Sequence, residues 1–415
     1  MIRFKNKYLK SGLWVLIEKV TKILTTLAIT SILARTVSVE EFGVYSYYLA
    51  IFAITTLLVS FGSEQLVIKD SSKGIECTLE SFFIIRLISS VITCIFLILF
   101  LYLFKLDYYY TLAIALVSIC QSFMVMTSYY QGIVNYKGIS ILSSFSLLIS
   151  LLIKIFLVAE YQERYLSVVM IFDFLLISFI LALFLSKHIK IINNTSSLKL
   201  SIVRNFKRSF PLLISALGIV IYSRIDQFMI YKMLGSEQLA LYSSVVRIGD
   251  VFAFIPAVAI NAFIPYYEKK KNEGSDVILK FFKYVVIYAI IVIFIINFFS
   301  STIISILYGD KYMSSTDILR FYSLAIFFSY IGAASNVWLI AHELQKYKTY
   351  RILGGCIINV FLNFLWIPSY GIQGAVFATI ISQCFASWIL NVVSKKTKPL
   401  FILQNKAFII YRWKN

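Results

Sequence analysis

The stretch RIDQFMIYKMLGSEQLALYSSVVRIGD, residues 224–250, decides the fold of this chain. It contains two apolar helical patterns joined by a short polar turn, and charged side chains lie inside both patterns. In a bilayer, a charged side chain at the centre of a helix costs about 2.5 to 3.5 kcal/mol, so it normally faces a bundle interior or a wet cavity. The stretch therefore predicts a membrane hairpin whose charged groups face inward.

The composition of the whole chain is that of a polytopic membrane protein. Hydrophobic residues make up 60% of the 415 residues and charged residues only 14%, and the mean hydropathy is +0.84. The apolar segments are about 20 residues long rather than alternating strands of about ten, so helices and not a barrel satisfy the backbone in lipid. We therefore predict an all-α fold.

The net charge of +19 indicates membrane orientation rather than nucleic-acid binding, because lysine and arginine accumulate in cytoplasmic loops. The five cysteines are scattered without a CxxC spacing, there are only two histidines, and no GxxxxGK[ST] loop is present. A disulfide framework, a zinc site and P-loop ATP hydrolysis are therefore not indicated, and we expect no metal and no other cofactor.

The apolar segments predict about twelve membrane spans in two groups of about six. The predicted spans are 14–34, 42–61, 82–104, 110–129, 139–158 and 166–186 in the first half, and 210–231, 239–264, 281–307, 318–341, 352–367 and 372–393 in the second. The predicted organisation is an N-terminal lobe (1–186), a basic cytoplasmic linker (187–209), a C-terminal lobe (210–394) and a basic amphipathic tail (395–415).

The distribution of basic residues predicts the orientation of these spans. Most lysines and arginines lie in the loops between every second pair of spans, whereas the intervening loops are short and poor in them. By the positive-inside rule, both chain ends are expected in the cytoplasm. The tail after Pro399 mixes aromatic residues and cations like a helix lying on the membrane surface, and a poorly ordered end is the alternative.

Two short motifs recur at about half the chain length. EEFGVYS (40–46) aligns with EQLALYS (237–243), and NYK (135–137) aligns with KYK (346–348). The halves are therefore interpreted as parallel repeats related by an axis along the membrane normal. This arrangement lets two lobes rock about a central site.

Polar residues in the first predicted span form one stripe. Glu18, Lys19 and Lys22 recur with three threonines at three- and four-residue spacing. One interpretation is a cationic wall for an anionic ligand, and the other is an internal ion pair between Glu18 and Lys22. Lys19 has no such partner, which favours the ligand. On the fifth span, Lys154 is either a further ligand or reaches water at the outer end, and Asp173 is its candidate counter-ion.

The opening hairpin carries two further cations. Arg224 and Arg247 lie at similar depth, about 12 Å from the shared turn at 1.5 Å per residue. Two guanidiniums there, with the lysines of the first span across the lobes, suit a phosphate ligand, because arginine binds phosphate through paired hydrogen bonds and remains charged when buried. The alternative is structural pairing of Arg247 with Asp250 or Asp226. The intramembrane acids are candidates for ion coupling or for ion pairs: Glu18, Asp173, Asp226 and Asp250.

Four stretches spread over most of the chain carry a family resemblance. They are EEFGVYSYYLA (40–50), RIDQFMIYKMLGSEQLALYS (224–243), FIPAVAINAFIP (254–265) and IPSYGIQGAVFATIIS (367–382). In this order, and with this number of spans, the chain resembles the polysaccharide repeat-unit flippases of O-antigen and capsule synthesis. These belong to the multidrug/oligosaccharidyl-lipid/polysaccharide exporter superfamily.

The resemblance implies a task and a location. A relative of these flippases would turn an undecaprenyl-pyrophosphate-linked oligosaccharide across the bacterial cytoplasmic (inner) membrane by alternating access, for O-antigen, lipopolysaccharide, capsule or exopolysaccharide synthesis. It implies substrate contacts on the first, seventh and eighth spans, which map onto Lys19, Lys22, Arg224 and Arg247. Physically, a pyrophosphate cannot cross hydrocarbon unpaired, whereas a cationic cavity offers it replacement partners.

Two other classes of function compete with this interpretation. An ion-coupled drug or cation antiporter of the same superfamily would use the intramembrane acids, but the neighbouring cations work against a cationic ligand. A membrane polysaccharide polymerase or lipid-linked glycosyltransferase would need a large outside loop with catalytic residues, and the outside loops are short. We therefore expect a transporter without catalytic residues. Its expected partners are membrane lipids, an H⁺ or Na⁺ gradient and polysaccharide assembly proteins.

Overall fold

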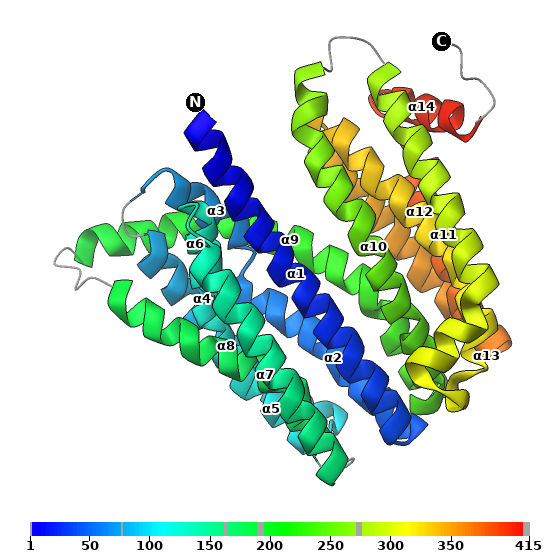
Figure 1. The fold of residues 1–415 in the computed structure, drawn as a ribbon, viewed down its shortest axis with the longest axis horizontal. Coiled ribbons are helices and arrows are strands. Elements are labelled where there is room, and N and C mark those ends of the chain that lie inside the picture. The colour runs from blue at the N-terminus through cyan, green and yellow to red at the C-terminus, as the bar shows by residue number, and fades with distance from the viewer. Residues whose placement is uncertain (1, 76–77, 162–164, 189–194, 271–275, 410–415) are drawn as a thin grey trace. The chain divides into compact units, whose positions relative to one another are not determined.

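The computed structural model of the chain describes residues 2–75, 78–161, 165–188, 195–270 and 276–409. All regular structure in these ranges is helical (Figure 1), so the all-α prediction is confirmed. The described chain divides into two compact units. Unit 1 comprises Met1–Val37 and Tyr48–Val220, and unit 2 comprises Ser38–Tyr47 and Ile221–Asn415.

Unit 1 is built on long helices with shorter helices between them. Its elements are α1 (Ile2–Thr36), α2 (Val39–Ser60, whose first turns belong to unit 2), α3 (Glu64–Ser72), α4 (Thr78–Phe104), α5 (Tyr108–Cys120), η1 (Gln121–Met124), α6 (Val125–Gly132), α7 (Lys137–Tyr161), α8 (Leu166–His188) and the first part of α9 (Thr195–Leu234). Helix α7 packs on α1 and on α8, and α5 packs on α4 and on α8. Helix α5 begins where the side chain of Asp107 accepts a hydrogen bond from the backbone N–H of Tyr110 at 3.1 Å, a standard N-cap.

Unit 2 is centred on α12, which packs on three neighbours, α10, α11 and α13. Its elements, after the end of α9, are α10 (Ser236–Lys270), α11 (Asp276–Tyr308), η4 (Asp310–Tyr312), α12 (Ser315–Ala341), α13 (Gln345–Ser387), η5 (Ile389–Asn391) and α14 (Lys398–Phe408). Helix α13 has two arms, because Gly371 adopts φ 58° and ψ −139° after Pro368. Proline removes a backbone donor and glycine accepts a positive φ, so the break falls between the predicted spans 352–367 and 372–393.

The predicted spans agree with these helices. Nine helical segments of the described chain are long and apolar enough to cross a membrane. The remaining predicted spans correspond to α1, α10 and the second arm of α13. The polytopic architecture is therefore confirmed, while the cytoplasmic placement of both ends stays a prediction.

The basic segment 187–209 differs from a simple linker. From Thr195 onward it is helical and continues without interruption into the seventh predicted span. Its polar residues are partners of unit 1: Asn205 donates to the Ser81 hydroxyl at 2.9 Å, and Arg208 makes two hydrogen bonds to Asp70 at 2.6 and 2.9 Å. The two units consequently divide inside α9, after Val220, and not at the polar segment. Residues 189–194 of the predicted linker lie outside the described residues.

Of the two interpretations of the predicted tail (395–415), the described residues support the helix rather than the poorly ordered end. Residues Lys398–Phe408 form α14, which packs on α11 and α12. Its buried face carries Leu400, Leu403 and Ala407. The i, i+3, i+7 spacing of these residues explains why one side of the helix docks on unit 2. Residues 410–415 of the predicted tail lie outside the described residues.

Candidate functional site

The hairpin of residues 224–250 forms as predicted inside unit 2. Helix α9 ends at Leu234, Gly235 takes φ 93°, and α10 begins at Ser236. The first copy of the repeated motif packs on this turn, because a Cβ atom on Gly43 would lie 1.9 Å from the carbonyl oxygen of Ser236. Only a glycine in α2 allows the two copies of the motif to approach this closely.

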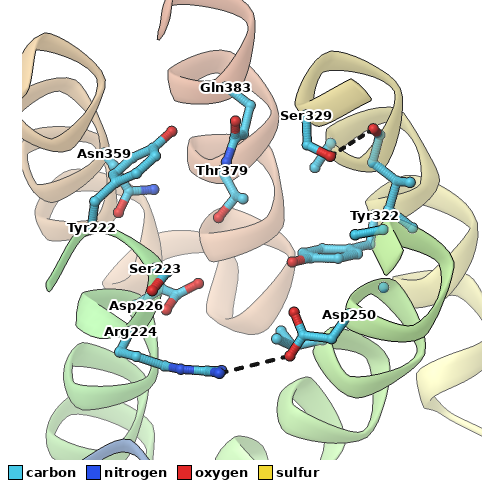
Figure 2. Close-up of a pocket in the computed structure, with 15 residues that line it drawn as sticks. Tyr222, Ser223, Arg224, Asp226, Asp250, Tyr322, Ser329, Asn359, Thr379 and Gln383 are labelled. Atoms are coloured by element: carbon cyan, nitrogen blue, oxygen red, sulfur yellow. Dashed lines mark hydrogen bonds and ion pairs between the residues drawn. The ribbon is translucent and has the colours of Figure 1, made fainter. Parts of the chain in front are cut away.

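Unit 2 contains a cavity of about 280 Å³ between α9, α10, α12 and both arms of α13. Figure 2 shows that tyrosines, amides and hydroxyls face it together with one arginine and two aspartates. Its polar lining consists of Tyr222, Ser223, Arg224, Asp226, Asp250, Tyr322, Ser329, Asn359, Thr379 and Gln383. A concave site with a few converging charged groups is the usual form of a ligand site.

Arg224 and Asp250 face one another across the cavity (Figure 2). Their closest atoms, Arg224 Nη2 and Asp250 Oδ2, are 3.7 Å apart, and the side chains are 28% and 62% exposed. This separation exceeds that of a hydrogen bond, which is about 2.7 to 3.2 Å. The guanidinium therefore keeps donors available for a stronger acceptor.

Asp226 lies in the same cavity but in a different environment. Its carboxylate accepts a short hydrogen bond from the hydroxyl of Tyr242 and another from the backbone N–H of Gln227 at 2.8 Å. The Tyr242 hydroxyl also lies 3.4 Å from that of Thr379. Among the described residues no cation lies within ion-pair distance of Asp226, which is 6% exposed. The hydrogen-bond donors to this carboxylate among the described residues are therefore neutral groups.

A ladder of neutral polar residues continues from the cavity into α13. Tyr222 donates to Ser382 at 3.3 Å, Asn359 donates to the same hydroxyl at 3.3 Å, and Asn363 donates to Asn359 at 3.0 Å. The sequence placed Tyr222 on the same helix face as Asp226, but it did not single out Ser382, Asn359 and Asn363 or the cavity residues of α12. The available signal was the pair of asparagines at i, i+4 in an apolar span, because polar groups inside a membrane normally face protein or a cavity.

Arg247 does not line the cavity, and its predicted pairing with Asp250 or Asp226 is absent from the ion pairs of the described chain. Its guanidinium carbon lies 5.8 Å from the ring centre of Phe42, and its buried Nε has no hydrogen-bond partner among the described residues. The rings of Tyr308 and Tyr312 surround Phe42 at 6.4 and 5.7 Å. Aromatic faces attract cations, which explains this position.

Two candidate cations of unit 1 lie on α1. Lys19 and Lys22 are both exposed, and the ammonium of Lys22 lies 5.3 Å from the ring centre of Phe174. Glu18 accepts a short hydrogen bond from the hydroxyl of Tyr136. The proposed internal pair between Glu18 and Lys22 does not occur among the ion pairs of the described residues. Both lysines therefore remain available to a ligand.

Lys154 and Asp173 form a buried ion pair between α7 and α8. Nζ of Lys154 lies 2.7 Å from Oδ2 of Asp173, and the side chains are 3% and 23% exposed. Ser150 donates a further short hydrogen bond to the same carboxylate. The counter-ion considered for Lys154 is therefore present, and its ammonium does not reach water.

The fold, with its long apolar helices, is that of a multi-pass membrane protein. Similar solved structures include the lipid II flippase MurJ in an inward closed conformation, with a TM-score of 0.71, 14% identity, and coverage of 96% of this chain and 91% of that one. Another is the outward-facing conformation of a multidrug resistance MATE family transporter of the MOP superfamily, with a TM-score of 0.61, 12% identity, and coverage of 98% and 97%. At these identities the likeness concerns the fold alone.

Sequence comparison assigns the family. The model of the polysaccharide biosynthesis protein family matches residues 32–317, and the chain belongs to this family. The capsular polysaccharide biosynthesis protein CapF of Staphylococcus aureus is 23% identical over 396 residues, which cover 90% of this chain and 96% of that protein. An uncharacterized membrane protein of Methanocaldococcus jannaschii is 27% identical over 219 residues, covering 50% of this chain and 42% of that protein.

Family and fold together make the chain a multi-pass membrane protein of the polysaccharide biosynthesis family, with the helical fold of the MurJ and MATE structures. They also agree with the predicted location, a multi-pass protein of the bacterial inner membrane.

Proposed function

We propose that this protein is a transporter, a flippase that moves undecaprenyl-pyrophosphate-linked oligosaccharide repeat units across the cytoplasmic membrane by alternating access. It would do so without catalytic residues of its own. The observation that carries the proposal is the loosely paired guanidinium of Arg224 in a polar cavity of an otherwise apolar unit. Family membership and the capsular relative point in the same direction.

The pair of Arg224 and Asp250 is suited to the reversible binding of an anionic substrate. A carboxylate 3.7 Å away stabilises the guanidinium while the cavity holds no substrate. A phosphate offers two oxygens in the geometry that arginine prefers and carries more charge, so it can replace the carboxylate. Asp250 is 62% exposed, so its carboxylate can then turn toward water without a large desolvation cost.

Lys19 and Lys22 are proposed as the cations with which unit 1 binds an anionic substrate. Both are exposed on α1 and form no ion pair with a described residue, whereas Lys154 would first have to leave Asp173. Arg247 is a weaker candidate because it lies over Phe42, outside the cavity. The lipid tail needs no protein site, since hydrocarbon already dissolves it.

The cavity residues also suit a saccharide. Tyr222 and Tyr322 offer aromatic faces, while Asn359 and Gln383 offer amides that both donate and accept hydrogen bonds. We propose that part of the oligosaccharide occupies this cavity while the pyrophosphate binds Arg224. The identity of the sugar would then depend on these uncharged side chains.

Asp226 is proposed as the group that couples transport to an ion gradient. A carboxylate surrounded by neutral donors in a low-dielectric site gains strongly from binding H⁺ or Na⁺. Arg224 and Asp250 line the same cavity, so a change of charge at Asp226 alters the field that the substrate meets.

The test replaces Arg224 or Lys22 by alanine and measures flipping of a lipid-linked oligosaccharide in vesicles that contain the purified protein. We expect a loss of at least tenfold, because a hydrogen bond to a charged group contributes about 1.5 to 3 kcal/mol. Lys232→Ala is the matched control, since Lys232 is an exposed lysine at the end of the same helix α9. Wild-type flipping by both variants would refute the assignment of these residues.

An ion-coupled multidrug or cation antiporter is the second candidate, because two aspartates line the cavity. Arg224 opposes it, since a guanidinium in the same cavity repels a cationic drug. Gradient-driven expulsion of a cationic dye from the same vesicles, without oligosaccharide flipping, would decide for the antiporter.

A further inference from the structure

One end of unit 2 collects cations from two segments of the chain. No aspartate or glutamate follows Glu343, whereas nine basic residues do: Lys346, Lys348, Arg351, Lys395, Lys396, Lys398, Lys406, Arg412 and Lys414. These cations form two groups that lie far apart in the chain, one at the start of α13 and one around α14. The positive-inside rule places both groups at the cytoplasmic face.

Hydrogen bonds bring the two groups together. Arg351 Nη1 donates to Asn391 Oδ1 at 3.0 Å, and Asn391 in turn donates to Gln404 of α14 at 3.0 Å. Gln404 is fully buried and donates to the Ser335 hydroxyl at 2.8 Å and to the Ser387 carbonyl at 2.9 Å. Helix α14 is therefore anchored beside Arg351.

Arg351 is a buried charge without a counter-ion. Its side chain is 5% exposed, and its only hydrogen bond among the described residues is the one to the neutral Asn391. Its Nε is buried with no partner, and no carboxylate of the described residues lies within ion-pair distance of it. A buried guanidinium in this state is costly unless an anion completes the site.

The surface around Arg351 indicates where this anion comes from. Lys395, Lys396, Lys398 and Lys406 are all exposed. They alternate with apolar side chains that are also exposed: Val393 at 76%, Ile402 at 45% and Ile409 at 60%. A segment that presents cations and apolar groups on the same side lies at a membrane surface, where the apolar groups enter the acyl region and the cations meet headgroups. A dissolved phosphate would leave these apolar groups in water.

We propose that the Arg351 end of unit 2, closed by α14, binds anionic phospholipids of the cytoplasmic leaflet. Arg351 takes the phosphate of one headgroup, and the four exposed lysines of residues 395–406 contact its neighbours. This site is separate from the cavity at Arg224 and does not depend on what the protein transports.

The experiment measures lipid binding to the purified full-length protein in a mild detergent. Phosphatidylglycerol and phosphatidylcholine with identical acyl chains are titrated, and bound lipid is counted by native mass spectrometry. We expect the wild type to prefer phosphatidylglycerol by at least tenfold. Arg351→Gln should weaken phosphatidylglycerol binding about fivefold, and replacement of the four exposed lysines by glutamine should weaken it further, since each cation near an anionic surface contributes by about that factor.

Two controls make the outcome decisive. Lys232→Gln removes an exposed lysine from the other end of unit 2 and should leave binding unchanged. Arg351→Lys keeps the charge and should retain most of the binding, which separates loss of the cation from misfolding of Arg351→Gln. Unchanged phosphatidylglycerol affinity in both the Arg351→Gln and the four-lysine variants would overturn the proposal. Competition by millimolar inorganic phosphate would overturn it too, because the site would then belong to a dissolved anion.

Discussion

The ion pair of Lys154 and Asp173 can be used to distinguish a structural role of Lys154 from a role in substrate binding. The sequence had identified Lys154 as a candidate substrate ligand. Replacing Asp173 by asparagine leaves Lys154, which is 3% exposed, without its counter-ion. Breaking a buried pair by removing one partner costs about 3 to 5 kcal/mol. Asp173 itself is 23% exposed, so the pair is partly screened and we expect the lower end, about 3 kcal/mol.

The reciprocal change should cost less. Lys154→Met leaves the carboxylate of Asp173 partly exposed and still hydrogen-bonded to Ser150. We expect about 1 to 2 kcal/mol for this variant, and close to wild-type stability for the double variant Lys154→Met with Asp173→Leu, because a matched apolar pair can replace a buried ion pair.

The assay is denaturant unfolding of the purified variants in detergent, followed by flipping measurements in vesicles. If the pair is structural, the double variant recovers both stability and flipping. If Lys154 also binds substrate, stability recovers but flipping does not. Wild-type stability of Asp173→Asn would refute the reasoning, because it would mean that the ammonium of Lys154 does not need this carboxylate.

Three further variants test other contacts. Gly43→Ala places a Cβ atom 1.9 Å from a carbonyl oxygen and should lower stability in denaturant unfolding by about 1 to 3 kcal/mol, whereas Gly138→Ala, with nothing within 4 Å, should not. Asp226→Asn should reduce the flipping rate under an imposed H⁺ or Na⁺ gradient to the rate measured without a gradient. If this variant still responds to the gradient as the wild type does, Asp226 is not the coupling group. Arg208→Ala leaves the carboxylate of Asp70, which is 2% exposed, without its partner and should destabilise the protein by about 3 kcal/mol. Asp70→Ala leaves an arginine that is 32% exposed and should destabilise the protein by only about 1 kcal/mol. Equal losses of stability in the two variants would contradict the argument from burial.

Periodicity and composition predicted the architecture well, because they act locally. The cost of leaving a backbone group unpaired in lipid forces each apolar run of about 20 residues into a helix. Pro368 and Gly371 likewise mark the break in α13 wherever the neighbours lie. The linker was less well predicted, because Asn205 and Arg208 look like solvent-exposed residues until their partners on α4 and α3 are known.

The candidate site was predicted in part. The sequence of the 224–250 hairpin identified Arg224, Asp226 and Asp250 as candidates, and these three residues line one cavity. It did not reveal that Arg224 rather than Arg247 is the partner of Asp250. Nor did it identify the residues of α12 and α13 that complete the cavity, although the i, i+4 asparagines of α13 were a usable signal.

The sequence by itself determined the all-helical membrane fold, the positions of the spans, the repeated hairpin and the faces on which charges lie. Only the tertiary structure decided which charged side chains have partners. Glu18 accepts a hydrogen bond from Tyr136, Lys154 forms an ion pair with Asp173, and Arg351 forms no ion pair with any carboxylate of the described residues. The physical reason is that helical periodicity sets the depth and direction of a side chain along its own helix. What lies opposite depends on how helices distant in sequence pack, and that packing sets whether a buried charge is paired, loosely held or left for a ligand.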